Sequence, residues 1–396
     1  MRIVLIADVF PPLRTSGAVQ LRDLSLEFVN QGHEVTMMVA APELDVPFRV
    51  EDWRSVRVVR LKTSKTKDIG YVHRTFNEFL MPFAMLRNLR KSPLAVEKWD
   101  GIAWYSPTIF LGPMVSVLKH ASACRSYLIL RDIFPEWSVD MGLMGRGLPY
   151  KILKTIAKYQ YSVADVIGVQ TQGNCSFFTD WLKGPGRRAE VLQNWLAGAP
   201  AAGCSISIDQ TALVGRKIFV YAGNMGVAQG MGILLQLAER LKTRADIGFL
   251  FVGRGSEAQR LRSQAKQLAL DNVVFFDEID PDEIPGLYAQ CDVGLIALDP
   301  RHKTHNIPGK FLSYMQAGMP VLASINPGND LADLISAQQV GRVCTDDSAE
   351  SMAVNALELI ASIGRDPSIK DQCKRLASQL FSPETAVKQI VNALQR

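Results

Sequence analysis

The chain has 396 residues, of which 47% are hydrophobic and 21% are charged. These values are ordinary for a globular protein, and the length favours two domains over one. The longest apolar runs, such as residues 108–118, fall short of the roughly 18 residues that cross a bilayer, so no membrane-spanning helix is expected.

The N-terminus and the cysteines indicate a compartment. Asp8 follows only five apolar residues, so no secretory signal is predicted. The six cysteines lie far apart without a CxxC pair, which favours reduced thiols over a disulfide framework or a zinc site. We therefore expect a cytoplasmic protein.

The charge is unevenly divided along the chain. Residues 1–195 carry 25 basic and 18 acidic side chains, a balance of +7, whereas residues 196–396 carry 19 and 21, a balance of −2. A basic first half favours an anionic partner, either a membrane surface or nucleic acid, and a merely uneven surface is the alternative. No RNA-binding motif or recognition helix is evident, so nucleic acid is the less favoured partner.

The first half begins with a βαβ pattern. A buried strand at residues 2–7, a loop at 8–17, a helix ending at Gly32 and a strand at 34–40 follow one another. Gly17 lies in the loop after the first strand, where open α/β sheets bind their ligands. The loop does not match GxGxxG, so a dinucleotide fingerprint is absent.

Two basic amphipathic segments lie in this half. Residues 72–91 combine aromatic and aliphatic side chains with arginine and lysine, and residues 150–158 repeat the mixture with lysines. Such a helix can lie on an anionic membrane surface, or it can be a core helix with a solvated basic end. The sequence leaves both readings open.

Charged residues follow a predicted strand at 127–130. Asp132 and Glu136 come directly after it, and either would serve as a base or bind a sugar hydroxyl. The alternative is that Asp132 caps a helix and Glu136 is solvated. Further strands are predicted at 165–171 and 189–194.

The pattern restarts after residues 197–215, which are rich in Ala, Gly, Ser and Pro and are interpreted as a linker. Strands are predicted at 217–222, 247–252, 273–276 and 292–297, with helices between them. Alternating strands and helices predict a parallel sheet covered on both faces.

Residues 308–323 predict a phosphate-binding helix terminus. Phe311, Leu312 and Met315 have helical spacing, Gly318 ends the helix, and Lys310 adds a positive charge near its free amides. An ordinary turn with a solvated lysine is the alternative.

Two glycine loops accompany this stretch, at 223–226 and 253–257, and both follow strands of the same predicted sheet. Together with Arg254 and Lys310 they predict a phosphate-bearing ligand held by backbone amides, without a required metal. Asp277, Glu278 and Asp280 are interpreted as helix caps. The alternative is a doubly wound domain whose loops bind nothing.

Several motifs taken in order resemble the GT-B fold glycosyltransferases of the retaining family 4 type. They are Gly32-His-Glu-Val35, Gln193-Asn194, Tyr221-Ala-Gly-Asn-Met-Gly226, Phe251-Val-Gly-Arg-Gly-Ser-Glu257 and Tyr314-Met-Gln-Ala-Gly-Met-Pro-Val-Leu322. The resemblance implies an α/β fold of two Rossmann-like doubly wound parallel-sheet domains facing a cleft. It implies an acceptor domain at 1–196, a nucleotide-sugar domain at 197–378, and a last helix at 379–396 that crosses back to the first domain.

The resemblance also implies partners. The donor would be a nucleotide sugar, and the acceptor a polyprenyl-diphosphate-linked saccharide at the inner membrane, where the enzyme would be peripherally bound. Asn306-Ile-Pro-Gly-Lys310 and Gly223-Asn-Met-Gly-Val-Ala-Gln229 resemble the transferases of L-fucosamine-type N-acetylated amino sugars. Those enzymes build O-antigen (lipopolysaccharide) and capsule from UDP-sugars.

This chain departs from the family pattern at three places. The usual pair of glutamates would fall on His305 and Ser313. Gln229 is the nearest polar residue where the family has Arg and Lys, and Arg131-Asp132 stands where a histidine precedes an aspartate. Lys310 and Arg254 would compensate for the lost charge.

The predicted mechanism is metal-independent transfer with retention, with no cofactor beyond the UDP-sugar substrate. Lys310 and Arg254 would stabilise the leaving diphosphate, and domain closure would exclude water. A UDP-sugar epimerase and a non-catalytic nucleotide-sugar binder remain alternatives. The predicted catalytic residues are Asp132, Glu136, Lys310 and His305. The predicted donor-binding residues are Gly17, Gly223, Asn224, Gly226, Gln229, Gly253, Arg254, Asn306, Pro308, Gly309, Lys310 and Ser313.

Overall fold

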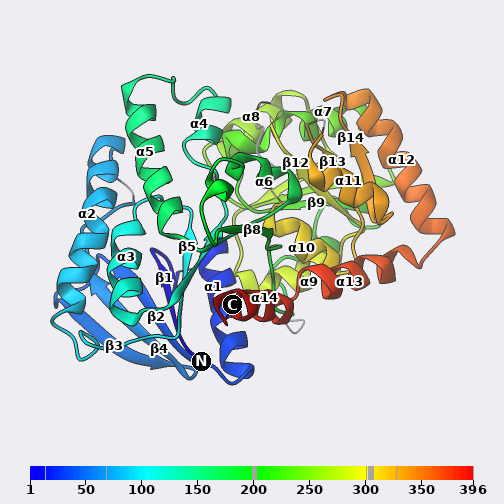
Figure 1. Cartoon of the computed structure of the whole chain (residues 1–396). Coiled ribbons are helices and arrows are strands. Elements are labelled where there is room, and N and C mark those ends of the chain that lie inside the picture. Colours follow the sequence, from blue (N-terminus) through cyan, green and yellow to red (C-terminus); the bar gives the residue numbers. More distant parts are fainter. Residues whose placement is uncertain are drawn as a thin grey trace. The chain divides into compact units, whose positions relative to one another are not determined.

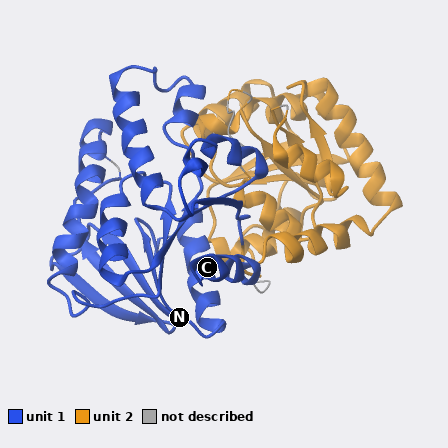
Figure 2. Ribbon diagram, viewed as in Figure 1, with its two compact units in different colours: residues 1–195, 383–396 blue, residues 196–382 orange. Residues whose placement is uncertain are grey.

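A computed structural model describes residues 1–13, 15–67, 69–198, 203–299, 301, 307–326 and 328–395. The chain forms two units, which Figure 2 shows in different colours. Unit 1 comprises Met1–Trp195 and Pro383–Arg396, and unit 2 comprises Leu196–Ser382. The sequence had divided the chain after residues 196 and 378.

Unit 1 contains one eight-stranded sheet in the order β3-β4-β2-β1-β5-β6-β7-β8. Its strands are parallel except β3, which pairs with β4 in the antiparallel sense. The order reverses between β1 and β5, and a ligand crevice is expected at such a point. The strands are β1 (Arg2–Ala7), β2 (Glu34–Ala41), β3 (Phe48–Trp53), β4 (Val56–Lys62), β5 (Gly101–Ser106), β6 (Arg125–Leu130), β7 (Val166–Val169) and β8 (Arg188–Val191).

Helices cover both faces of this sheet because its central strands are apolar on both sides. α1 (Ser16–Asn30) and α14 (Pro383–Gln395) pack over one face, where Ile3 and Leu5 point. α2 (Tyr71–Leu89), α3 (Gly112–Ser122) and α5 (Leu148–Val163) pack over the other, where Val4 and Ile6 point. The last helix therefore belongs to unit 1, and Figure 1 shows it beside α1.

Unit 2 contains a six-stranded parallel sheet in the order β11-β10-β9-β12-β13-β14, which reverses between β9 and β12. Its strands are β9 (Lys217–Ala222), β10 (Ile247–Val252), β11 (Val273–Phe276), β12 (Val293–Ala297), β13 (Val321–Ser324) and β14 (Gly341–Cys344). One face is covered by α7 (Gly232–Arg240), α8 (Ala258–Gln267) and α12 (Ala349–Arg365). The other is covered by α9 (Ile284–Tyr288), α10 (Gly309–Gln316), α11 (Asp330–Ala337) and α13 (Ile369–Leu380).

The predicted parallel α/β architecture is confirmed, with four local corrections. The sequence analysis missed β3, because an edge strand with half its residues exposed has the polar pattern of a loop. It also missed β5, although all six of its residues are buried, and the four-residue edge strand β14. The supposed linker 197–215 is part of unit 2, since Ile206, Ile208 and Leu213 are buried in its core.

Candidate active site

The N-terminus of α10 is built as the sequence predicted. Phe311, Leu312 and Met315 are buried in the core of unit 2, which fixes the helix against the sheet. Gly318 has a φ of +69° just beyond the helix, so its predicted role at the C-terminus is confirmed. Pro308 occupies the N-cap position and offers no side-chain acceptor. The first amides of the helix are therefore available to an anion or to water.

Lys310 lies half-buried on the first turn of α10. Its Nζ is 4.6 Å from the centre of the Tyr221 ring, at the end of β9. Within the described residues no acidic side chain pairs with it. Burial lowers the pKa of Lys310 to about 8, because the charged ammonium loses solvation without gaining a counter-charge. An anionic ligand would supply that counter-charge.

The loop after β9 approaches this lysine through glycine. Gly223 has a φ of +140°, and a Cβ atom there would lie 3.6 Å from Lys310 Cε. The Tyr221 hydroxyl donates to the Asn224 carbonyl at 2.6 Å. Gln229 Oε1 accepts from the Gly226 amide at 3.0 Å and from Asn224 Nδ2 at 3.4 Å. Gln229 thus organises the turn, a role that the sequence analysis did not foresee.

The loop after β10 packs backbone against backbone on the loop after β9. The Met225 amide donates to the Arg254 carbonyl at 2.7 Å, and the Glu257 amide donates to the Met225 carbonyl at 2.9 Å. Gly253 and Gly255 have φ values of +142° and +152°, and a Cβ on either would collide with the facing backbone. Both glycines are therefore required for this contact.

The side chain of Arg254 has another partner in this structure. It is 77% exposed and forms an ion pair with Glu278 at 2.8 Å. The interpretation of Glu278 as a helix cap was wrong, because its carboxylate is used by this arginine. Lys310 is consequently the stronger candidate for a diphosphate contact.

The loop after β12 meets the loop after β9 where the strand order reverses. The Asp299 amide donates to the Ala228 carbonyl at 3.1 Å, and a Cβ on Gly230 would lie 3.1 Å from Asp299 Cα. Arg301 forms a bidentate ion pair with Asp299, at 2.7 and 2.8 Å. This contact marks the edge of the sheet at which doubly wound folds bind ligands.

Three further predicted site residues, His305, Asn306 and Ser313, follow β12 in the sequence. His305 and Asn306 lie outside the described residues. Ser313 is half-buried one turn into α10, and its hydroxyl donates to the Gly309 carbonyl at 3.4 Å.

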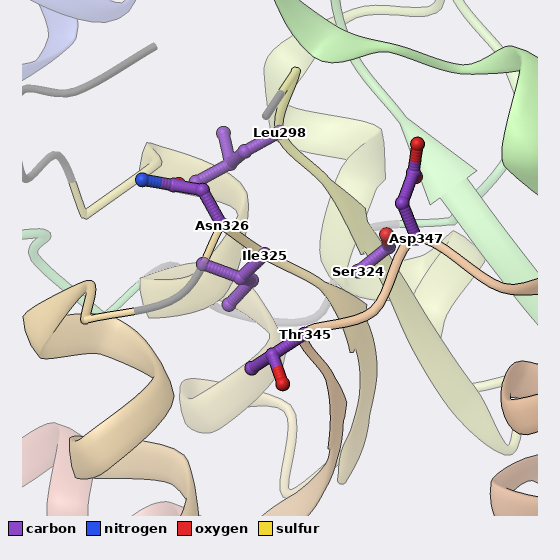
Figure 3. A pocket seen from close by; sticks show the side chains of 6 residues that line it. All are labelled: Leu298, Ser324, Ile325, Asn326, Thr345 and Asp347. Atoms are coloured by element: carbon purple, nitrogen blue, oxygen red, sulfur yellow. The ribbon is translucent and has the colours of Figure 1, made fainter. Parts of the chain in front are cut away.

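A small pocket opens at the same edge of the sheet. Figure 3 shows its six lining side chains, which follow β12, β13 and β14. Its volume is about 10 Å³, close to the space of one water molecule. The pocket is too small for a nucleotide. Its lining residues are Leu298, Ser324, Ile325, Asn326, Thr345 and Asp347.

The corresponding edge of unit 1 is built differently. A Cβ on Gly17 would lie 3.2 Å from Tyr105 Cε1, so a larger residue would crowd the ring against which α1 packs. The Tyr105 hydroxyl donates to Gln20 Oε1 at 2.7 Å. Burial raises the pKa of Tyr105, which keeps its hydroxyl protonated. Gly17, predicted to bind the donor, has a clear packing role here.

Arg131 and Asp132 follow β6. Arg131 is only 5% exposed, stacks 4.7 Å from the centre of the Trp195 ring, and donates from Nη1 to the Leu192 carbonyl at 3.1 Å. Asp132 is half-buried beside it. The helix-cap alternative for Asp132 was wrong, because Pro135 is the N-cap of α4 (Glu136–Asp140).

Glu136 is already engaged in an ion pair. It is half-buried, with Lys154 Nζ at 2.9 Å and the Tyr150 hydroxyl at 3.4 Å. The solvated alternative for Glu136 was therefore wrong. Instead, Glu136 is tied to α5 through Lys154 and Tyr150.

The sequence analysis missed Asp8. It is half-buried at the end of β1, and its Oδ1 has no hydrogen-bond partner within the described residues. Burial raises its pKa, while the charges of Lys67 and Arg74 act in the opposite direction. The rule that selected Asp132, an acid directly after a buried strand, would have selected Asp8 as well.

Within the described residues, no group of three or more His, Cys, Asp or Glu side chains is arranged to hold a metal ion. In that same part of the chain, no helix is both long and apolar enough to cross a bilayer.

Comparisons with known proteins add the enzyme class. Residues 216–362 match the family described as "Glycosyl transferases group 1". The chain is 23% identical over 398 residues to WcaI of Escherichia coli K12, with 92% of each chain covered. WcaI is named as a glycosyl transferase of colanic acid biosynthesis. The chain is also 23% identical over 243 residues to WbjE of Pseudomonas aeruginosa, with 60% of each chain covered. WbjE is named as a glycosyltransferase.

Solved structures share the fold. Sucrose-phosphate synthase from Thermosynechococcus elongatus superposes with a TM-score of 0.78 at 16% identity, over 100% of this chain and 98% of the other. HepE from Anabaena in complex with UDP superposes with a TM-score of 0.68 at 14% identity, over the whole of both chains. The predicted GT-B fold and the predicted enzyme class are both confirmed.

Proposed function

We propose that this GT-B fold glycosyltransferase transfers a sugar from a UDP-sugar to a polyprenyl-diphosphate-linked saccharide, with retention of the anomeric configuration. The sugar would be an N-acetylated amino sugar, and the product a bacterial surface polysaccharide such as O-antigen or capsule. The similarity to WcaI, named for colanic acid biosynthesis, supports the polysaccharide. The complex of HepE with UDP supports the nucleotide.

The half-buried Lys310 is the observation that carries the proposal. Its ammonium lies at the N-terminus of α10 against Gly223, without an acidic partner within the described residues. The positive end of the helix dipole, free amides and an uncompensated cation together suit a diphosphate. The glycines after β9 let that diphosphate approach the backbone closely.

In the proposed reaction the bond between the anomeric carbon and the diphosphate oxygen breaks. An acceptor hydroxyl oxygen bonds to the same face of that carbon, and its proton passes to the departing diphosphate. Negative charge therefore grows on the diphosphate as the bond breaks. Lys310 and the α10 amides would stabilise that charge, so the step calls for no metal.

Unit 1 would orient the acceptor. Asp8 and Asp132 stand at the carboxyl ends of β1 and β6, and both are half-buried. A carboxylate in such a position can accept a hydrogen bond from a sugar hydroxyl and fix its direction. Glu136, which forms an ion pair with Lys154, is a third acidic side chain, and it also follows β6.

The test combines nucleotide binding with turnover. Calorimetry with UDP, GDP and ADP should give tightest binding for UDP. Lys310→Ala should weaken UDP binding and reduce transfer to a bacterial lipid extract by at least about a hundredfold. Lys266→Ala, on α8, serves as a matched control and should change neither. Transfer in EDTA should match transfer without it.

The same assay separates the alternatives. Conversion of a UDP-sugar without acceptor would indicate an epimerase. UDP binding without transfer to any extract would indicate a non-catalytic binder. Unchanged turnover in Lys310→Ala would contradict the leaving-group role.

A further inference from the structure

Exposed apolar side chains concentrate on unit 1. Of twenty large hydrophobic residues exposed within the described chain, seventeen belong to unit 1 and three to unit 2. Six of the seventeen lie on α2, namely Tyr71, which lies on another side of the helix, and five others with exposed fractions from 39% to 82%. They are Val72, Phe76, Phe79, Leu80 and Phe83.

These five residues, here called the α2 stripe, share one side of their helix. At about 100° per residue they fall within roughly 100° of the helix circumference. Met81, Met85 and Leu89 lie on the opposite side and are buried against the sheet. The stripe therefore faces away from the core, although a surface helix usually turns polar residues outward.

The C-terminal end of α2 is basic. Arg87, Arg90 and Lys91 are exposed, and within the described residues none of them pairs with an acid. Arg87 and Arg90 project on the same side as the stripe, by the same 100° spacing. The one acidic residue of α2, Glu78, pairs with Arg74 at 2.8 Å. The stripe thus ends in uncompensated positive charge.

α5 extends this surface. Leu148, Ile152 and Tyr159 are exposed along one line of the helix, beside Lys151 and Lys158, and α5 contains no acidic residue. α3 packs against both α2 and α5, so the two helices flank it over the same face of the sheet (Figure 1).

We propose that the α2 stripe binds an anionic lipid bilayer. Its aromatic rings would enter the boundary between headgroups and acyl chains, and Arg87, Arg90 and Lys91 would contact lipid phosphates. Charge complementarity favours lipid over a second copy of this chain, because neither α2 nor α5 offers a free acid to pair with these basic residues. Binding to the bilayer would bring the enzyme to its lipid-linked acceptor. This inference therefore rests on the proposed function.

Vesicle flotation tests the proposal with the full-length chain. The protein should bind vesicles of phosphatidylcholine mixed with phosphatidylglycerol, and bind poorly to phosphatidylcholine alone. Phe76→Ser with Phe83→Ser should weaken binding by about tenfold per ring. Arg87→Gln with Arg90→Gln should weaken it by about fivefold per charge. High salt should reproduce the second effect.

Phe177→Ser is the matched control, because Phe177 lies outside these helices and is 44% exposed against 48% for Phe83. It should bind vesicles like the unaltered protein. UDP affinity should be unchanged in all of these variants, so a loss of vesicle binding is distinct from a failed donor site. Equal binding to neutral vesicles, or no binding at all, would overturn the proposal. A dimer in light scattering that Phe76→Ser with Phe83→Ser dissociates would overturn it too, by assigning the stripe to a second copy.

Discussion

The two units share a topology but use the carboxyl edges of their sheets differently. In each, the strand order reverses beside the first strand of the unit. Unit 2 lines that edge with glycine turns and with Lys310, a cation that pairs with no acid among the described residues. Unit 1 lines it with buried charges of both signs and a phenol, namely Asp8, Arg131 and Tyr105.

The two edges carry different residues because, in the proposed function, unit 2 binds the donor diphosphate and unit 1 binds the acceptor sugar. A diphosphate is large and highly charged, so it is best held by many backbone amides at close range. A sugar hydroxyl is neutral and directional, so it is best held by fixed polar side chains. Duplicating the topology therefore did not duplicate the chemistry. The outer surfaces of the two units also differ, because the exposed large apolar residues among the described residues lie mainly on unit 1.

The largest effect is expected from a substitution that disrupts the packing of the loop after β10 on the loop after β9 in unit 2. Gly255→Ala would place a methyl group against the Met225 backbone at a φ of +152°, so we expect roughly 3 kcal/mol of destabilisation and loss of UDP binding. Gly364→Ala is the control, since a Cβ there meets open space in α12. Urea denaturation should show that control to be within about 1 kcal/mol of the unaltered protein. Equal stability of both variants would contradict the packing argument.

The second prediction uses the titration of Lys310. With a pKa of about 8 in the free protein, its ammonium is charged below that pH and neutral above it. UDP is fully ionised above neutrality, so its affinity should fall about tenfold between pH 7 and pH 9 as the lysine loses its proton. Calorimetry in buffers of different ionisation enthalpy should detect proton uptake on binding near pH 8. Lys310→Arg should bind with little dependence on pH over this range, and a persistent dependence in that variant would assign it to another group.

The third prediction concerns the acceptor edge of unit 1. Asp8→Asn should lower kcat/KM for the acceptor by about a hundredfold, because it removes a carboxylate that we propose orients an acceptor hydroxyl. The dissociation constant of UDP should stay unchanged, since the proposed donor contacts belong to unit 2. Asp180→Asn removes a carboxylate whose side chain is 94% exposed, and steady-state kinetics should show no change in that control. A parallel loss of UDP affinity in Asp8→Asn would place Asp8 in donor binding instead.

The sequence predicted the parts of this molecule that depend on local pattern. Buried strands such as β9 and β10 stand out because parallel sheets bury both faces, and Gly318 marks the end of α10 by its conformational freedom. Partners far apart in the sequence were beyond its reach. The pairings of Arg254 with Glu278 and of Glu136 with Lys154 depend on which loops the fold brings together. The outward aromatic stripe of α2 is intermediate, since its spacing is visible in the sequence but the face turned to the core is not.

The smallest predicted effect distinguishes two roles for Glu136. Either its carboxylate contacts the acceptor, or it only forms a structural ion pair between α4 and α5. Its half-buried ion pair with Lys154 should be worth about 0.5–1 kcal/mol. A double-mutant cycle of Glu136→Gln and Lys154→Met, followed by thermal unfolding, should recover that coupling. If the pair only holds α4 against α5, each single variant should lower kcat less than about threefold and by the same factor. A loss of kcat confined to Glu136→Gln would instead mean that this carboxylate acts on the acceptor.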